Sequence, residues 1–167
     1  MTRTQVAMLL TLGLAGCTTV SPQLTAAPPP PPPPPVELGS INGLAAFHTA
    51  GGAHRSCSGL SVLLIAQTPQ TDTRMSALYG SQVHAVAPVT LVKARSAKLG
   101  PPPSTMQSYS AQCDLNGRFS FGDLQAGGYF LIARVRLQPP QAGVDDLVIL
   151  QHVALHAGEA REVELAQ

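Results

Sequence analysis

Asp114-Leu115-Asn116-Gly117-Arg118-Phe119-Ser120-Phe121-Gly122-Asp123-Leu124-Gln125-Ala126-Gly127-Gly128-Tyr129 is the stretch that decides the fold of this 167-residue chain. It begins with a turn in which Asn116 and Gly117 tolerate positive φ. Polar and aromatic residues then alternate, and this places Phe119 and Phe121 on one face of a strand. The pattern predicts a turn between two strands, the second of which directs its two rings into a core.

The end of the same stretch predicts how the chain continues into the next strand. We expect Leu124 to close one end of the core and Gly127 or Gly128 to adopt the left-handed conformation of a turn. Tyr129 then starts a strand over 129–137, packs in the core and needs a partner for its hydroxyl group. Within this strand Tyr, Leu, Ala, Val and Leu lie on one face, and Phe, Ile and two Arg residues lie on the other.

Short strands separated by turns recur on both sides of this stretch. We expect strands at 41–47, 60–66, 147–155 and 161–165, with turns at 50–53 and 156–159. Residues 71–73 are expected to cap a short helix that runs to Tyr79 and ends at Gly80. Residues 81–106 are ambiguous: 84–92 could form a strand interrupted by Pro88, and three prolines at 101–103 disfavour a helix. Turns at intervals of about eight to twelve residues predict an antiparallel β-sandwich.

The central stretch resembles the D-x-x-G-x-F-x-F-x-x-L-x-x-G-x-Y core of carboxypeptidase regulatory-like domains. The matching residues are Asp114, Gly117, Phe119, Phe121, Leu124, Gly127 and Tyr129. Residues 59–69 and 153–165 are similar to the second strand and the closing hairpin of an exported bacterial subgroup. The resemblance implies an all-β, antiparallel sandwich of the seven-stranded, transthyretin-like type, with one short helix in an inserted loop. It implies a non-catalytic accessory module. Cys113 departs from the usual Thr, and 70–108 is longer than in the minimal domain.

The N-terminal residues resemble the signal peptide of a bacterial lipoprotein. Arg3 precedes a short apolar run, and Leu14-Ala15-Gly16-Cys17 is similar to a lipobox. The resemblance implies cleavage after 1–16, palmitate or another acyl group on Cys17, and anchoring in membrane lipid. Thr18 is not the Asp that retains many such lipoproteins in the inner membrane of Gram-negative bacteria, so for a Gram-negative source the resemblance implies the outer membrane, facing the periplasm.

The chain then divides into a linker and a folded domain. Residues 17–36 contain eight consecutive prolines and form a stiff, Pro-rich linker. The folded domain is expected over 37–167.

The three cysteines leave one pair if Cys17 carries lipid. Cys57 and Cys113 would then lie in an exported, oxidising compartment, and the arithmetic favours a disulfide between them. Two free thiols, or a metal site, are the alternatives that the count leaves open, although no C-x-x-C motif supports a metal.

Composition and motifs argue against several classes of function but do not identify one. Charged residues make up 11% of the chain and its net charge is +1, which argues against a nucleic-acid partner. Asp114, Asn116 and Asp123 could supply calcium ligands, but turn chemistry explains them better and we expect no metal or cofactor. No catalytic set can be assembled from the motifs. The favoured hypothesis is a non-catalytic envelope protein that binds a protein or glycan. A purely structural role through an edge strand and an unrecognised enzyme are the alternatives.

Overall fold

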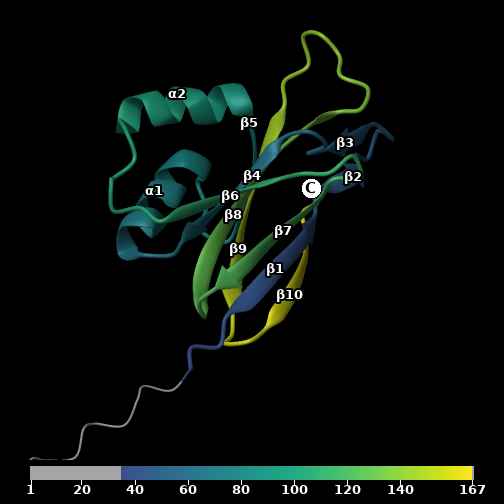
Figure 1. The fold of residues 1–167 in the computed structure, drawn as a ribbon. Coiled ribbons are helices and arrows are strands. Elements are labelled where there is room, and N and C mark those ends of the chain that lie inside the picture. Colours follow the sequence, from purple (N-terminus) through teal and green to yellow (C-terminus); the bar gives the residue numbers. More distant parts are fainter. Residues whose placement is uncertain (1–34, 167) are drawn as a thin grey trace, which may run out of the picture. The chain divides into compact units, whose positions relative to one another are not determined.

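The computed structural model describes residues 35–166, which form ten strands and two helices. In chain order these are β1 (Gly39–Leu44), β2 (Ala46–His48), β3 (His54–Ser56), β4 (Ser61–Ala66), α1 (Pro69–Tyr79), β5 (His84–Pro88), α2 (Val89–Leu99), β6 (Ser108–Gln112), β7 (Arg118–Leu124), β8 (Gly127–Leu137), β9 (Leu147–Leu155) and β10 (Ala160–Glu164). One sheet has the order β10-β1-β7, and the other has seven strands arranged around β8, which pairs with β3, β4 and β9. The two sheets form a sandwich-like fold, and both helices lie beside the larger sheet (Figure 1).

Two apolar cores lie on opposite faces of the larger sheet, and β8 contributes to both. Tyr129, Leu131 and Val135 point into the core between the two sheets. Phe130 and Ile132 point the other way and pack under the helices with residues such as Met75 and Leu78 of α1. The alternation predicted for 129–137 is therefore confirmed. Burial of both faces explains why β4, β8 and β9 are rich in apolar residues.

The first predicted strand is in fact two strands in different sheets. Residues 39–44 belong to the small sheet and 46–48 to the large one, and the chain crosses between them at Ala45. This residue is fully buried, and its N–H donates to the carbonyl of Gly117 while its own carbonyl accepts from the N–H of Cys57. A further difference is that β1 pairs with β10 in parallel, so the sandwich is not wholly antiparallel.

The predicted helix forms, but its cap differs from the expected one. α1 begins at Pro69, and the N-cap is Thr68, whose hydroxyl accepts from the N–H of Thr71 at 3.1 Å. The Thr71 hydroxyl in turn accepts from the N–H of Thr68, which completes a capping box. Residues 71–73 are therefore inside the helix. It ends at Gly80, which is left-handed with φ 76°.

A second helix corrects the expectation of a single one. The strand at 84–92 stops at Pro88, and α2 follows immediately over 89–99. Its N-cap is a proline without a capping side chain. The carboxylate of Asp145, from a distant loop, accepts instead from the N–H and the hydroxyl of Thr90, at 3.2 and 2.6 Å. The hydroxyl of Thr90 is the main cause of a lowered pKa for Asp145.

Within residues 35–166, no helix has the length and apolarity to cross a membrane.

Candidate functional site

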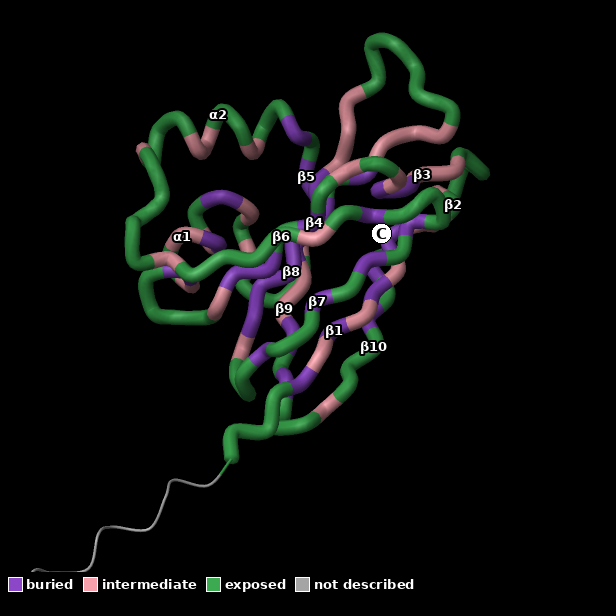
Figure 2. Tube along the Cα trace, viewed as in Figure 1, coloured by how far each residue is buried: buried purple, intermediate pink, exposed green. Residues whose placement is uncertain are grey.

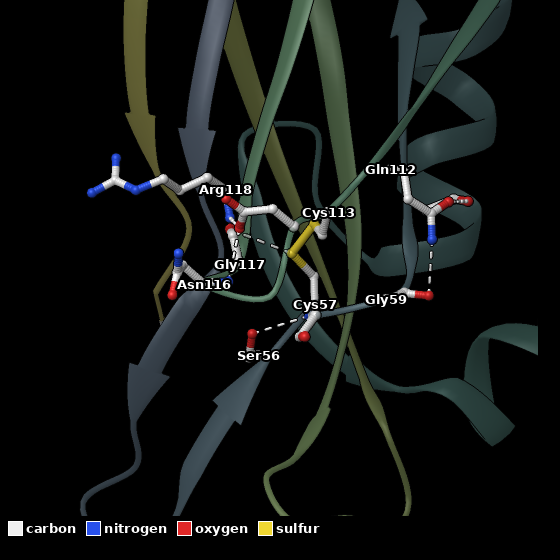
Figure 3. The surroundings of a disulfide bond; sticks show 11 residues. Ser56, Cys57, Gly59, Gln112, Cys113, Asn116, Gly117 and Arg118 are labelled. Carbon is white, nitrogen blue, oxygen red and sulfur yellow. Dashed lines mark hydrogen bonds between the residues drawn. A yellow bond between two sulfur atoms is a disulfide. The ribbon is translucent and has the colours of Figure 1, made fainter.

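Cys57 and Cys113 form the disulfide that the cysteine count favours. Their Cα atoms are 5.8 Å apart and both residues are buried in the core between the sheets. The bridge lies beside the β6–β7 turn, where the Cys57 sulfur is 3.5 Å from the carbonyl oxygen of Gly117 (Figure 3). Because the bridged sulfur carries no proton, this approach is a packing contact. The position points to a structural bridge at the corner where the chain passes between sheets. Cys17 lies outside the described residues.

Asp114 and Gly117 build the β6–β7 turn itself. One carboxylate oxygen of Asp114 accepts from the N–H groups of Asn116 and Arg118, both at 2.8 Å. Gly117 has φ 77°, and a Cβ there would overlap the side chains of neighbouring residues. Asn116 does not share this left-handed conformation. No group of three or more potential metal ligands occurs in the described part of the chain.

The aromatic residues of the central stretch belong to the core. Phe119 and Phe121 are 5% exposed, and their ring centroids are 6.0 Å apart in an edge-to-face arrangement. Leu124 is fully buried with them. The hydroxyl of Tyr129 donates to the carbonyl of Gln125 at 2.7 Å, and burial raises its pKa. These side chains are directed away from solvent and hold the two sheets together.

The left-handed residue of this region is not one of the two predicted glycines. Neither Gly127 nor Gly128 has positive φ, whereas Asp123 does, with φ 55°. A Cβ at Gly128 would collide with the amide oxygen at the end of the Gln67 side chain, which would have to move. The bend occurs earlier than predicted because the chain must leave the small sheet after β7 and enter the large one at β8.

A row of polar side chains crosses the outer face of the small sheet. The Ser120 hydroxyl donates to the Asn42 side-chain carbonyl at 2.7 Å, and the Asn42 amide donates to a Glu162 carboxylate oxygen at 3.0 Å. Register explains the row, because Asn42 on β1 lies opposite Ser120 on β7 and Glu162 on β10. Donors and acceptors thus follow one another across all three strands.

A second row lies beside the first and completes a surface that we call the polar face. Leu44 lies between Arg118 and Glu164 at the next outward-facing register position. Arg118 forms no salt bridge with any residue in 35–166. Two shallow hollows, of about 430 and 360 Å³, lie over the two rows. Both are lined by Arg118 and Glu162. The polar face therefore consists of Asn42, Leu44, Arg118, Ser120, Glu162 and Glu164.

A third hollow lies on the opposite side of the molecule, at the start of α1. Its volume is about 380 Å³, and it is lined by Thr68, Pro69, Gln70, Thr71, Arg74, Pro103, Thr105 and Met106. The hydroxyls of Thr68 and Thr71 are occupied by the helix cap, and Arg74 donates to the carbonyl of Gly100. The polar face differs from this hollow in bringing a guanidinium group and two carboxylates together on one side of a sheet.

Comparison with known proteins supports the fold alone. No family model matches the chain, and no curated protein matches its sequence. Among solved structures, the chain is similar to a putative carbohydrate binding protein (PA1324) from Pseudomonas aeruginosa, with a TM-score of 0.52 and 21% identity. The similarity covers 79% of this chain and 90% of that one. The two proteins share a sandwich-like architecture.

The polar face is not among the residues that the sequence singles out. Its three strands are far apart in the chain, and 78 and 120 residues separate Asn42 from its partners Ser120 and Glu162. The available signal was the alternation within each strand, which puts these polar residues opposite buried ones such as Ile41 and Phe119. Only the register across β1, β7 and β10 brings them into one row.

Proposed function

We propose that this chain is a lipid-anchored, non-catalytic, glycan-binding protein of the bacterial cell envelope. Its lipid would be attached at Cys17, its linker would span 17–36, and residues 37–167 would be a carboxypeptidase regulatory-like domain. The observation that carries the glycan proposal is the hydrogen-bonded row Ser120–Asn42–Glu162 beside a free Arg118. The shared fold with a protein described as carbohydrate-binding supports the same reading.

The chemistry of the polar face suits a sugar. Each sugar hydroxyl both donates and accepts, and amide, carboxylate and guanidinium groups offer matching partners in fixed planes. The second N–H of Asn42, the second oxygen of Glu162 and the Arg118 guanidinium are available for this purpose. Leu44 supplies an apolar patch for the C–H groups of a ring. No aromatic ring lies on this face in the described structure, so we expect weak binding at each site.

A glycan array tests the proposal. The probe is the mature chain carrying Cys17→Ala, so that no acyl group interferes, against neutral, acidic and N-acetylated oligosaccharides. Binding of at least one class, followed by titration calorimetry to obtain a Kd, is the expected result. If no glycan binds at millimolar concentration, the glycan proposal is wrong, and self-association under the same conditions would favour the structural alternative.

Matched variants locate the site. Asn42→Ala removes the centre of the polar row and the N–H that is available to the ligand, a hydrogen bond worth about 1 kcal/mol, so affinity should fall about fivefold. The control is Gln112→Ala, which removes a comparable exposed pair with Ser61 on the other sheet. Glycan binding that Asn42→Ala leaves intact would remove the polar face from consideration.

The anchor and the location are tested separately. Phase partitioning with detergent, applied to cells producing the full chain, should place the protein in the detergent phase. Cys17→Ala should release it or leave it unprocessed, and fractionation of the envelope should find the unchanged chain in the outer membrane. Unchanged partitioning of the variant would refute lipidation at this residue.

A further inference from the structure

The positive charge of the helical layer is concentrated on α2. The chain has only two lysines, Lys93 and Lys98, and both lie on this helix together with Arg95. α2 has no acidic residue. Arg74 of α1 adds a fourth cation, and its guanidinium lies at the end of α2, where it donates to the carbonyl of Gly100 at 2.8 Å. Against these four cations the two helices carry one acidic residue, Asp72, and a second carboxylate, that of Asp145, lies against the start of α2 at Thr90.

The small sheet has the opposite charge. Together with the turn that leads into β10, its strands carry four acidic residues and two basic ones: Asp123, Glu159, Glu162 and Glu164 against Arg118 and Arg161. The two cores show that the helices and the small sheet cover opposite faces of the large sheet. The domain is thus an electric dipole with a positive helical side and a negative sheet side.

The outward side of α2 combines cations with apolar atoms. Val89 and Val92 point inward and pack in the helix–sheet core. The outer face consists of the exposed residues of the helix, namely Thr90, Leu91, Lys93, Ala94, Ala97, Lys98 and Leu99, and Figure 2 shows α2 as a largely exposed segment. Leu91 is 42% exposed. The small alanines allow close approach of a surface to the helix, and lysine stems can lie along it while their ammonium groups reach outward.

We propose that the outer face of α2 docks on an anionic phospholipid surface. Lysine next to an exposed leucine is the combination found where helices lie in a membrane interface, and each cation near such a surface contributes attraction. The charge distribution carries this proposal without the Cys17 lipid, which would only raise the local concentration of the domain at the membrane. Docking in this orientation turns the acidic small sheet, and with it the polar face, away from the lipid.

Vesicle co-sedimentation tests the docking surface. The protein is the mature chain with Cys17→Ala, and the probes are vesicles of phosphatidylcholine alone or mixed with phosphatidylglycerol. We expect binding to the anionic vesicles only, weakening as salt is added. Lys93→Gln/Lys98→Gln should reduce the partition coefficient about 25-fold, at roughly fivefold for each lysine. Circular dichroism and the melting temperature of each variant report whether it is folded.

Charge-matched controls separate a docking surface from general attraction. Lys98→Gln and Arg161→Gln each remove one exposed cation, from α2 and from the small sheet respectively. The first should weaken binding about fivefold and the second should leave it unchanged. Lys93→Arg/Lys98→Arg should retain binding. Equal partition into both vesicle types, equal loss in the two single variants, or capture by the acidic polysaccharide polygalacturonate without vesicle binding would each overturn the proposal.

Discussion

Reduction of the Cys57–Cys113 bridge should lower the free energy of unfolding by about 4 kcal/mol. The two residues are 56 positions apart, and the chain-entropy model gives this value for a loop of that length. The closed loop contains β4, α1, β5, α2 and β6, so in the unfolded state the bridge restricts the whole segment that forms the helical layer. Domains of this size are typically stable by about 5–15 kcal/mol, and the bridge would therefore supply a large share.

Urea denaturation followed by circular dichroism measures this difference. Tryptophan fluorescence is not an option because the chain has no Trp. The protein carries Cys17→Ala to remove the third thiol, and oxidised and dithiothreitol-treated samples are compared. We also expect a larger m-value after reduction, because the unfolded chain becomes less compact. Cys57→Ala/Cys113→Ala is the control, since the reductant should not change its unfolding curve.

The reasoning would be refuted by reduced protein whose stability lies within about 1 kcal/mol of the oxidised form, well below the loop-entropy value. It would also be refuted if alkylation of the native, unreduced protein labelled both Cys57 and Cys113. Either result would mean that the corner between the sheets is held by packing and by the backbone hydrogen bonds of Ala45, without need of the bridge.

Three further perturbations test the packing and the titrating groups. Gly43→Ala should cost about 1–3 kcal/mol in urea denaturation because its Cβ would overlap a core aromatic ring, whereas Gly122→Ala, which meets open space, should leave stability unchanged. Burial raises the pKa of Tyr79 to about 12 from 10.0, so stability should fall by up to about 2.7 kcal/mol as pH rises through this interval, and Tyr79→Phe should abolish that loss. The lowered pKa of Asp145, due first to the Thr90 hydroxyl, means that its contribution is present above the ordinary pKa of 3.8 and is lost as pH falls below it. Asp145→Asn should therefore make the circular dichroism of α2 less sensitive to acid; an unchanged acid transition would contradict the capping role.

Sequence patterns over a few neighbouring residues correctly predict features whose structure depends on those same residues. The alternation over 129–137 predicts both faces of β8, because side chains on a strand alternate whatever lies beyond them. Gly80 ends α1 because a left-handed residue is needed at that point. The cysteine count predicts the bridge without any knowledge of the fold. For β8 and α1 the determining residues are neighbours in the chain, and for the bridge they are two of only three cysteines.

Contacts between distant segments account for the predictions that were wrong. α2 begins with β-branched residues after a proline, and its cap is supplied by Asp145 from 55 residues further on. The chain crosses between the sheets at Ala45, where it is held by backbone hydrogen bonds to Gly117 and Cys57. Both partners are distant in the sequence, so no local pattern predicts the crossing. The parallel pairing of β1 with β10 joins the two ends of the domain. The same pairing completes the polar row at Glu162, and for this reason the candidate site could not be read from the sequence.

The layered architecture determines where function can reside. The larger sheet has an apolar core on each side. The two outer layers differ in charge: the helices carry an excess of cations and the small sheet an excess of carboxylates. A domain tethered at its N-terminus and attracted to anionic lipid through α2 would present the polar face to the surrounding compartment. The two proposals are thus geometrically compatible, and each stands or falls on a different set of residues.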